Sequence, residues 1–290
     1  ATIIKGIDYA TANGADVLSM SIGHYNYSIA EEQALAKAYA KMVLVAAAGN
    51  DEININKKSM FPAAFTFVLA VEAGDEEGNL ASFSNYDPDG PLYSEFGEEQ
   101  LYNYELRAPG IDIMSTYPGG LYKSLNGTSM ACPLVAGAVS ALLERKEYAS
   151  KEILFGDLIY TRKQNGYANV DFKEAYDIKD EDRKPELSLV SYVMVDSVGG
   201  DGDGRPDAGD TISFYPGLKN MWGQAENIRM WMKVGYYDAT GDFVSDDTSL
   251  VKFLTDTIDF GRPLSSYAKN RSVNPIRFVV NKNCVDGRHI

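Results

Sequence analysis

The chain has 290 residues, 45% hydrophobic and 23% charged, a composition typical of a globular protein with one large domain or two ordinary ones. Its 41 acidic and 27 basic residues give a net charge of −14, which argues against binding to a phosphate backbone and excludes nucleic acid as a partner. The sequence has no apolar run of about 18 residues, so we expect no membrane span.

The chain opens on ATIIKGIDYATANG, which is typical of a helix and not of a signal peptide. We therefore expect the first residue to be a cut inside a larger protein. The two cysteines, Cys132 and Cys284, have neither metal-ligand spacing nor a disulfide framework, and we expect both to be unpaired.

Helix and strand patterns alternate in the first part of the chain. Residues 28–41 begin with a capping box, Ser28 followed by Glu31, and the runs DVLSMSI, MVLVAAA and TFVLAVEA are apolar on both faces. The predicted helices are 2–12 and 28–41, and the predicted strands are 16–22, 42–48 and 66–73. Strands of this kind separated by helices predict a parallel sheet flanked by helices, in the α/β class.

Function in such a sheet lies at the carboxyl ends of the strands. Those ends carry Ser21-Ile22-Gly23 and Gly49-Asn50. Farther along, SMACPLVAGAVSALLER is apolar almost all round and predicts a buried helix from Ser129 to about Arg145. Ser129 would then sit at a helix N-terminus, where the dipole and the unbonded backbone NH groups favour negative charge.

A serine is a poor nucleophile without a base and oxyanion donors, and an arbitrary Gly-Thr-Ser is most often a helix cap. Here the surrounding motifs, in order and in detail, resemble the subtilisin-like serine peptidases (subtilases), and the resemblance covers about residues 1–178. The motifs are ADVLSMSIG (15–23), VAAAGN (45–50), FPAAFTFVLAVEA (61–73), ASFSNY (81–86), LRAPGIDIMSTYPGG (106–120) and NGTSMACPLVAGAVSALL (126–143).

The resemblance implies a catalytic role for two residues: Ser129 as the nucleophile and Asn50 as the oxyanion-hole donor. It also implies two pocket walls for the substrate side chain that precedes the cut, formed by Ser21, Ile22 and Gly23 and by Ala47, Ala48 and Gly49. Because these walls are small and apolar, they would permit a large hydrophobic side chain. No cofactor is required for the chemistry, and a cis peptide bond is expected before Pro62.

The Asp and His of the subtilase triad precede the serine in motifs resembling DTG and HGTHVAG, and neither motif occurs here. The only histidines are His24, which follows the first wall, and His289. We expect a missing N-terminal portion of the same protein to supply Asp and His, and this chain alone to be inactive. Without that portion the sheet would expose an apolar edge, which predicts a homodimer or altered packing.

Composition shifts at residues 179–185, which we interpret as a linker. Period-two alternation in residues 186–290 predicts a small all-β sandwich domain, possibly truncated at its C-terminus and similar to accessory domains of secreted bacterial proteases. A Gly-rich loop places four carboxylates in a pattern that suits a structural Ca²⁺, although a tight acidic turn explains the same pattern. These carboxylates are Asp201, Asp203, Asp207 and Asp210.

The sequence therefore predicts a serine endopeptidase that acts on polypeptides and is secreted or attached to a bacterial cell surface. An esterase of the α/β-hydrolase type is disfavoured, because its GxSxG turn would end in glycine where this chain has Ala131. The open alternative is a non-catalytic pseudo-peptidase that binds peptides, or a surface-binding module.

Overall fold

A computed structural model describes residues 2–88, 104–145, 148, 150–164, 166, 168–198, 200–202, 204–237, 243–245 and 250–282. The described residues up to Arg183 form one compact unit, and those from Lys184 onward form a second. Within the described part of the chain, no helix is both long and apolar enough to cross a membrane.

The first unit is built on a parallel sheet of four strands, in the order β1-β2-β3-β4. Its strands are β1 (Val17–Met20), β2 (Val43–Ala47), β3 (Leu69–Gly74) and β4 (Leu106–Pro109). Every residue of β2 and β3 is buried, as their unbroken apolar runs predict. Strand β1 is the edge of this sheet among the described residues, and dimerisation through it stays a prediction that size-exclusion chromatography can test.

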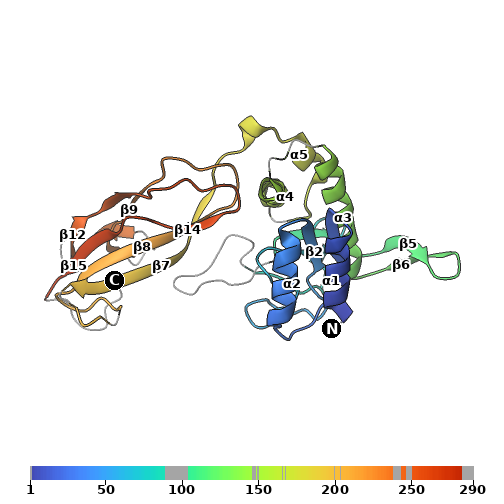
Figure 1. Cartoon of the computed structure of the whole chain (residues 1–290), viewed down its shortest axis with the longest axis horizontal. Helices are drawn as coiled ribbons and strands as arrows, with labels where there is room; N and C mark the ends of the chain where they lie inside the picture. The colour runs from blue at the N-terminus through green and yellow to red at the C-terminus, as the bar shows by residue number, and fades with distance from the viewer. Residues whose placement is uncertain are drawn as a thin grey trace. The chain divides into compact units, whose positions relative to one another are not determined.

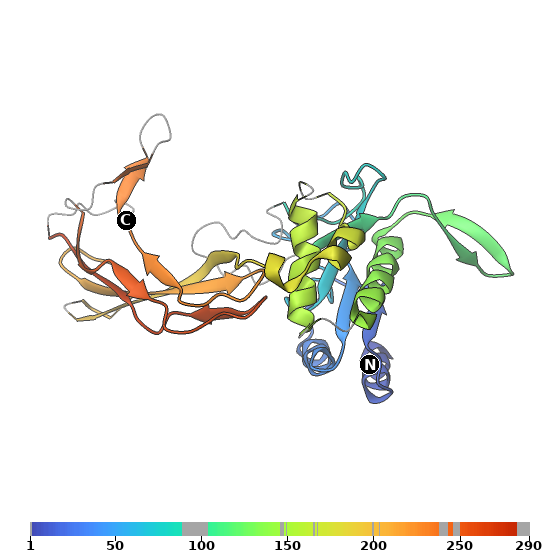
Figure 2. The ribbon, with the colours of Figure 1, turned by 90° about the horizontal axis from the view of Figure 1, so that it is seen from above.

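Helices cover both faces of the sheet, which confirms the predicted α/β fold (Figures 1 and 2). Leu44 and Ala46 of β2 pack in one cluster with Leu35 and Ala38 of α2. The alternate side chains of β2 point to the other face, where α3 contacts all four strands. The helices of this unit are α1 (Thr2–Ala12), α2 (Ile29–Tyr39), α3 (Thr128–Glu144), α4 (Lys151–Gln164) and α5 (Phe172–Asp177).

A hairpin of β5 (Ile113–Tyr117) and β6 (Leu121–Leu125) extends away from the sheet in both views (Figures 1 and 2). It exposes large apolar side chains, among them Met114 and Tyr122. Strand β6 leads through Gly127 directly into α3, so the hairpin is continuous with the segment that carries Ser129.

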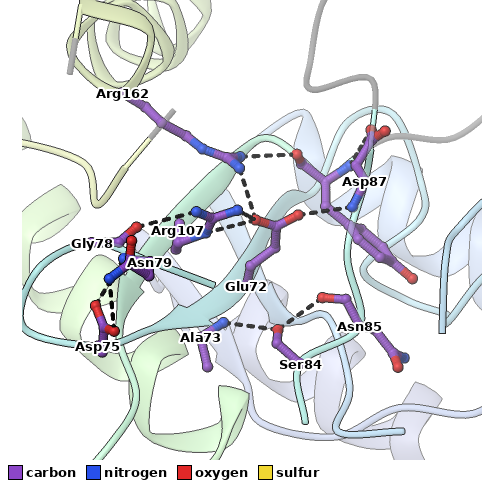
Figure 3. A network of polar contacts seen from close by, with 11 residues as sticks. Glu72, Ala73, Asp75, Gly78, Asn79, Ser84, Asn85, Asp87, Arg107 and Arg162 are labelled. Atoms are coloured by element: carbon purple, nitrogen blue, oxygen red, sulfur yellow. Dashed lines mark hydrogen bonds and ion pairs between the residues drawn. The ribbon is translucent and has the colours of Figure 1, made fainter. Parts of the chain in front are cut away.

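A buried ionic cluster joins β3, β4 and α4 (Figure 3). Glu72 is fully buried, and its Oε2 accepts hydrogen bonds from Arg107 Nη2 at 3.0 Å and Arg162 Nη2 at 2.7 Å. Its Oε1 accepts from the main-chain NH of Asp87 at 2.9 Å. Arg162 also donates to the carbonyl of Tyr104 at 3.2 Å. Both carboxylate oxygens are therefore hydrogen-bonded, as a buried charge requires.

The predicted linker contains a short 3₁₀ turn, η2 (Asp180–Asp182), followed by Arg183. Arg183 donates to the buried carboxylate of Asp157 in α4, from Nε to Oδ1 at 2.9 Å and from Nη2 to Oδ2 at 2.9 Å. This bidentate pair attaches the end of the segment to the first unit.

The second unit consists of antiparallel sheets. Five strands pair around β8, and two further pairs are β9 with β13 and β10 with β11. The strands are β7 (Leu187–Val198), β8 (Thr211–Asn220), β9 (Arg229–Trp231), β10 (Gly235–Tyr237), β11 (Phe243–Ser245), β12 (Val251–Thr255), β13 (Thr257–Asp259), β14 (Lys269–Arg271) and β15 (Ile276–Val280).

Two apolar clusters form the core of this unit. Ile212 packs with Phe278, and Leu218 packs with Phe260. Met232 contacts the first cluster and Met230 the second, so the alternating residues seen in the sequence do point inward. The antiparallel character is as predicted, while the assignment as a sandwich stays a prediction.

Candidate active site

The predicted pocket walls follow β1 and β2 at the carboxyl edge of the sheet. Ala47 and Ala48 are buried, whereas the side chain of Ile22 is 45% exposed and Gly23 is also exposed. Ser21 donates from Oγ to the carbonyl of Ser129 at 2.9 Å, which ties the first wall to the start of α3. The structure therefore brings the first wall and Ser129 together, although they are 108 residues apart in the sequence.

Thr128 connects Asn50 to the same helix start. Asn50 Oδ1 accepts hydrogen bonds from Thr128 N at 2.8 Å and from Thr128 Oγ1 at 3.0 Å. Thr128 Oγ1 in turn accepts from Gly49 N at 3.1 Å. These bonds identify the oxygen end of the Asn50 amide and leave its Nδ2 without a partner among the described residues.

Ser129 is half-buried in the first turn of α3. The helix begins after Gly127, whose φ of +151° lies in a region that side chains disfavour. The Ser129 hydroxyl forms no hydrogen bond within the described part of the chain. Its hydroxyl and the amide nitrogen of Asn50 are thus polar groups that the first unit itself does not use.

Residues 1–176 match the family model described as the subtilase family, Peptidase_S8. The chain belongs to the subtilase family. It is 44% identical over 145 residues to subtilisin DY of Bacillus licheniformis, a match that covers 49% of this chain and 48% of that protein. It is 39% identical over 146 residues to subtilisin BL of Lederbergia lenta, covering 50% of this chain and 48% of that protein.

This subtilase chain therefore spans about half the length of the curated relatives that it matches. Among solved structures it is similar to the patellamide maturation protease PatA, with 27% sequence identity and a TM-score of 0.49. That match covers 60% of this chain and 66% of the other.

Asn85 holds the segment around Asn50 in place, a function that the sequence analysis did not assign. Its side chain is fully buried; Oδ1 accepts from Asp51 N at 3.1 Å and Ile53 N at 3.0 Å, and Nδ2 donates to Ala48 O at 2.9 Å. The main-chain NH of Asn85 donates to Gly49 O at 2.9 Å. Asn85 lies inside the quoted motif ASFSNY, and this motif is the signal that could have found it.

Serine 84 and a tyrosine complete this clamp. Ser84 Oγ accepts from Ala73 N at 3.0 Å and donates to Asn85 O at 2.8 Å, which fixes Asn85 to β3 (Figure 3). Tyr25 donates to Asp51 Oδ2 at 2.6 Å and accepts from Asn85 Nδ2 at 3.0 Å. Burial, and then the hydrogen bond to Asp51, raise the pKa of the Tyr25 hydroxyl, so this hydroxyl stays a donor at neutral pH.

His24 does not contact Ser129 within the described part of this subtilase. Its Nε2 lies 2.8 Å from Oε2 of the buried Glu31 in α2, and its main chain pairs with that of Phe61. Ser28 caps α2 by accepting from Glu31 N at 3.3 Å, as the predicted capping box requires, while the Glu31 carboxylate is directed to His24. His289 lies outside the described residues.

Cys132 is buried on α3 beneath the first wall. Its Sγ lies 3.6 Å from Ser19 Oγ. Burial raises the pKa of the Cys132 thiol, so the thiol stays protonated at neutral pH and is unsuited to act as a second nucleophile. Cys132 is free, as predicted, and Cys284 lies outside the described residues. The Phe61–Pro62 peptide bond is cis, also as predicted.

The acidic loop of the second unit lies between β7 and β8. Asp210 is buried and accepts from Asp207 N at 3.0 Å, a turn-like contact, while Asp201 is exposed. Asp203 lies outside the described residues. Among the residues that are described, no group of three or more His, Cys, Asp or Glu side chains is placed to hold a metal ion. The described carboxylates alone therefore do not fit a calcium site, and calcium binding stays a prediction that depends on Asp203.

Proposed function

We propose that this chain is the portion of a secreted or cell-surface subtilisin-type endopeptidase that carries the nucleophile and the oxyanion donor. The observation that carries the proposal is Thr128, which binds Asn50 through its own backbone and hydroxyl and directly precedes Ser129. One residue thus fixes both proposed catalytic groups with respect to α3. In the proposed reaction Ser129 Oγ attacks the scissile carbonyl of a polypeptide.

The charge that develops on the carbonyl oxygen would be stabilised by Asn50 Nδ2 and by the backbone NH of Ser129. Both donors are preorganised, because Asn50 Oδ1 is held by Thr128 and the NH of Ser129 belongs to the first turn of α3. The bond from Ser21 to Ser129 O also holds the first wall beside this turn. Substrate would lie between the two walls with its side chain before the cut pointing into the pocket.

The base that accepts the Ser129 proton is proposed to come from outside these 290 residues, from a portion of the same protein that supplies Asp and His. This proposal is supported by the pairing of His24 with Glu31 and by the Ser129 hydroxyl, which has no hydrogen-bond partner in the described part of the chain. Triad members act as a unit, so this chain alone is expected to retain only a residual rate.

A fluorophosphonate probe tests this proposal, because the probe labels only an activated serine. Ser129 is expected to stay unlabelled in this chain and to react within minutes in the full-length protein, with Ser129→Ala as the matched control in both. Rapid labelling of Ser129 in the chain alone would show that a base is present and would overturn the proposed inactivity. Absence of Ser129-dependent labelling in the full-length protein would favour the peptide-binding pseudo-peptidase.

A further inference from the structure

The side chain of Met60 lies between the two predicted pocket walls. A Cβ atom placed on Gly23 of the first wall would be only 2.7 Å from Met60 Sδ, and one placed on Gly49 of the second wall would be only 2.6 Å from Met60 Cε. Such distances are shorter than van der Waals contact. The thioether therefore reaches the main chain of both walls, and only the absence of side chains at these two glycines leaves room for it.

Three hydrogen bonds fix the backbone from which this side chain extends. Met60 N donates to Tyr104 Oη at 3.1 Å, and His24 and Phe61 exchange two main-chain bonds of 2.8 Å each. His24 directly follows Gly23, so the Met60 segment is attached to the first wall itself. Met60 is only 7% exposed and packs in the same apolar cluster as Ala48.

We propose that Met60 forms the floor of the substrate pocket and limits the residue before the scissile bond to a small side chain, such as that of glycine, alanine or serine. The proposal rests on the proposed function, because it takes the segments that end in Gly23 and Gly49 as the pocket walls. The walls alone predicted room for a large hydrophobic side chain. Met60 comes from a third segment, and it occupies the space that this side chain would need.

A large side chain could enter only if Met60 moved from its packed position. Methionine is flexible, but its backbone is anchored on both sides and its side chain is nearly buried, so displacing it would break apolar contacts. A difference of one methylene in a hydrophobic pocket changes specificity about 10- to 200-fold. We expect discrimination of at least that order against phenylalanine.

Two peptide anilides that differ only in alanine or phenylalanine before the anilide bond measure this preference in the full-length protein. The wild type is expected to hydrolyse the alanine substrate with a kcat/KM about 10- to 200-fold higher. Met60→Ala opens the floor and should shift the preference toward phenylalanine, whereas Met60→Leu, of similar volume, should keep the preference for alanine. A wild type that prefers phenylalanine, or a preference unchanged in Met60→Ala, would overturn the proposal.

A binding measurement that needs no catalysis separates this proposal from the proposed function. In titrations of the 290-residue chain followed by NMR, p-cresol is expected to shift the resonances of Gly23 and Gly49 in Met60→Ala and to leave them unshifted in the wild type and Met60→Leu. If no anilide is cleaved in a Ser129-dependent way, the proposed function fails, and these titrations still decide the role of Met60. Equal binding of p-cresol by all three chains would refute a closed floor.

Should Met60→Ala fail to fold, as shown by circular dichroism, the wild type and Met60→Leu remain informative. Both are expected to bind no p-cresol between the walls and to favour the alanine anilide. Binding of p-cresol by the wild type that shifts Gly23 and Gly49 would be sufficient to reject the proposal.

Discussion

The first unit contains two polar clusters that use their hydrogen-bonding groups in opposite ways. Around Glu72 the groups are charged and buried, and both carboxylate oxygens are bonded. Around Thr128 the groups are neutral, and the Asn50 amide nitrogen and the Ser129 hydroxyl have no partner among the described residues. The first cluster completes its interactions within the fold, whereas the second keeps donors available for another molecule. The two clusters should therefore respond differently to substitution.

Glu72→Gln is expected to cause the largest loss of stability. The substitution keeps the shape of the side chain but leaves Arg162, which is 1% exposed, buried beside a neutral amide. Breaking a buried pair in this way costs about 3–5 kcal/mol of unfolding free energy. Urea denaturation followed by far-UV circular dichroism measures it, because every α-helix of the described chain belongs to the first unit.

The second unit provides an internal control for that experiment. Both tryptophans, Trp222 and Trp231, belong to it, so the fluorescence transition should stay at the wild-type urea concentration. A helix transition within about 0.5 kcal/mol of the wild type would be the size expected for a surface substitution and would show that the cluster is not what stabilises the first unit.

Asn85→Ala is expected to have an intermediate effect and to link the two kinds of cluster. It would leave the buried NH groups of Asp51 and Ile53 and the carbonyl of Ala48 unsatisfied, at a cost of about 1–3 kcal/mol each at most. The same denaturation measures this loss, and Asn79→Ala in an exposed turn is the matched control. Equal effects of the two substitutions would contradict the role of Asn85 as a clamp.

Asn50→Ala should have the smallest effect on stability and a large effect on chemistry. Asn50 is exposed and accepts two bonds from Thr128, so its loss should cost about 0.5–1.5 kcal/mol. In the full-length protein, turnover should fall about 100- to 1000-fold, as for the removal of one oxyanion donor. Anilide hydrolysis measures the turnover, and a fall of less than tenfold would remove Asn50 from the oxyanion hole.

Sequence reasoning succeeded where local pattern determines position. The apolar runs placed β1, β2 and β3 and hence the strand ends, because parallel strands buried on both faces need continuous apolar residues. The start of α3 beside Ser129 was also predictable, since its apolar run follows directly. The roles of Ser129 and Asn50 came from motif resemblance, and composition or periodicity alone could not have supplied them.

Contacts between distant segments could not be predicted in the same way. Met60, Asn85 and Tyr25 each belong to a loop, and nothing in their local pattern specifies which side chains they meet. The pairing of Glu72 with Arg162 spans 90 residues and depends on α4 crossing the end of the sheet. In each case the missing information is tertiary packing, which also explains why pocket walls read from the sequence gave no indication of a floor.

The placement of Met60 separates the depth of the pocket from the alignment of the reacting groups. Thr128 and Asn85 hold the catalytic segments through bonds to main-chain atoms, and Met60 contacts none of those bonds directly; its own anchor is Tyr104. A change at residue 60 can therefore alter which peptides fit without moving the nucleophile or the oxyanion donor. For a protease lineage, such an arrangement makes diet a matter of one side chain, while the chemistry is inherited unchanged.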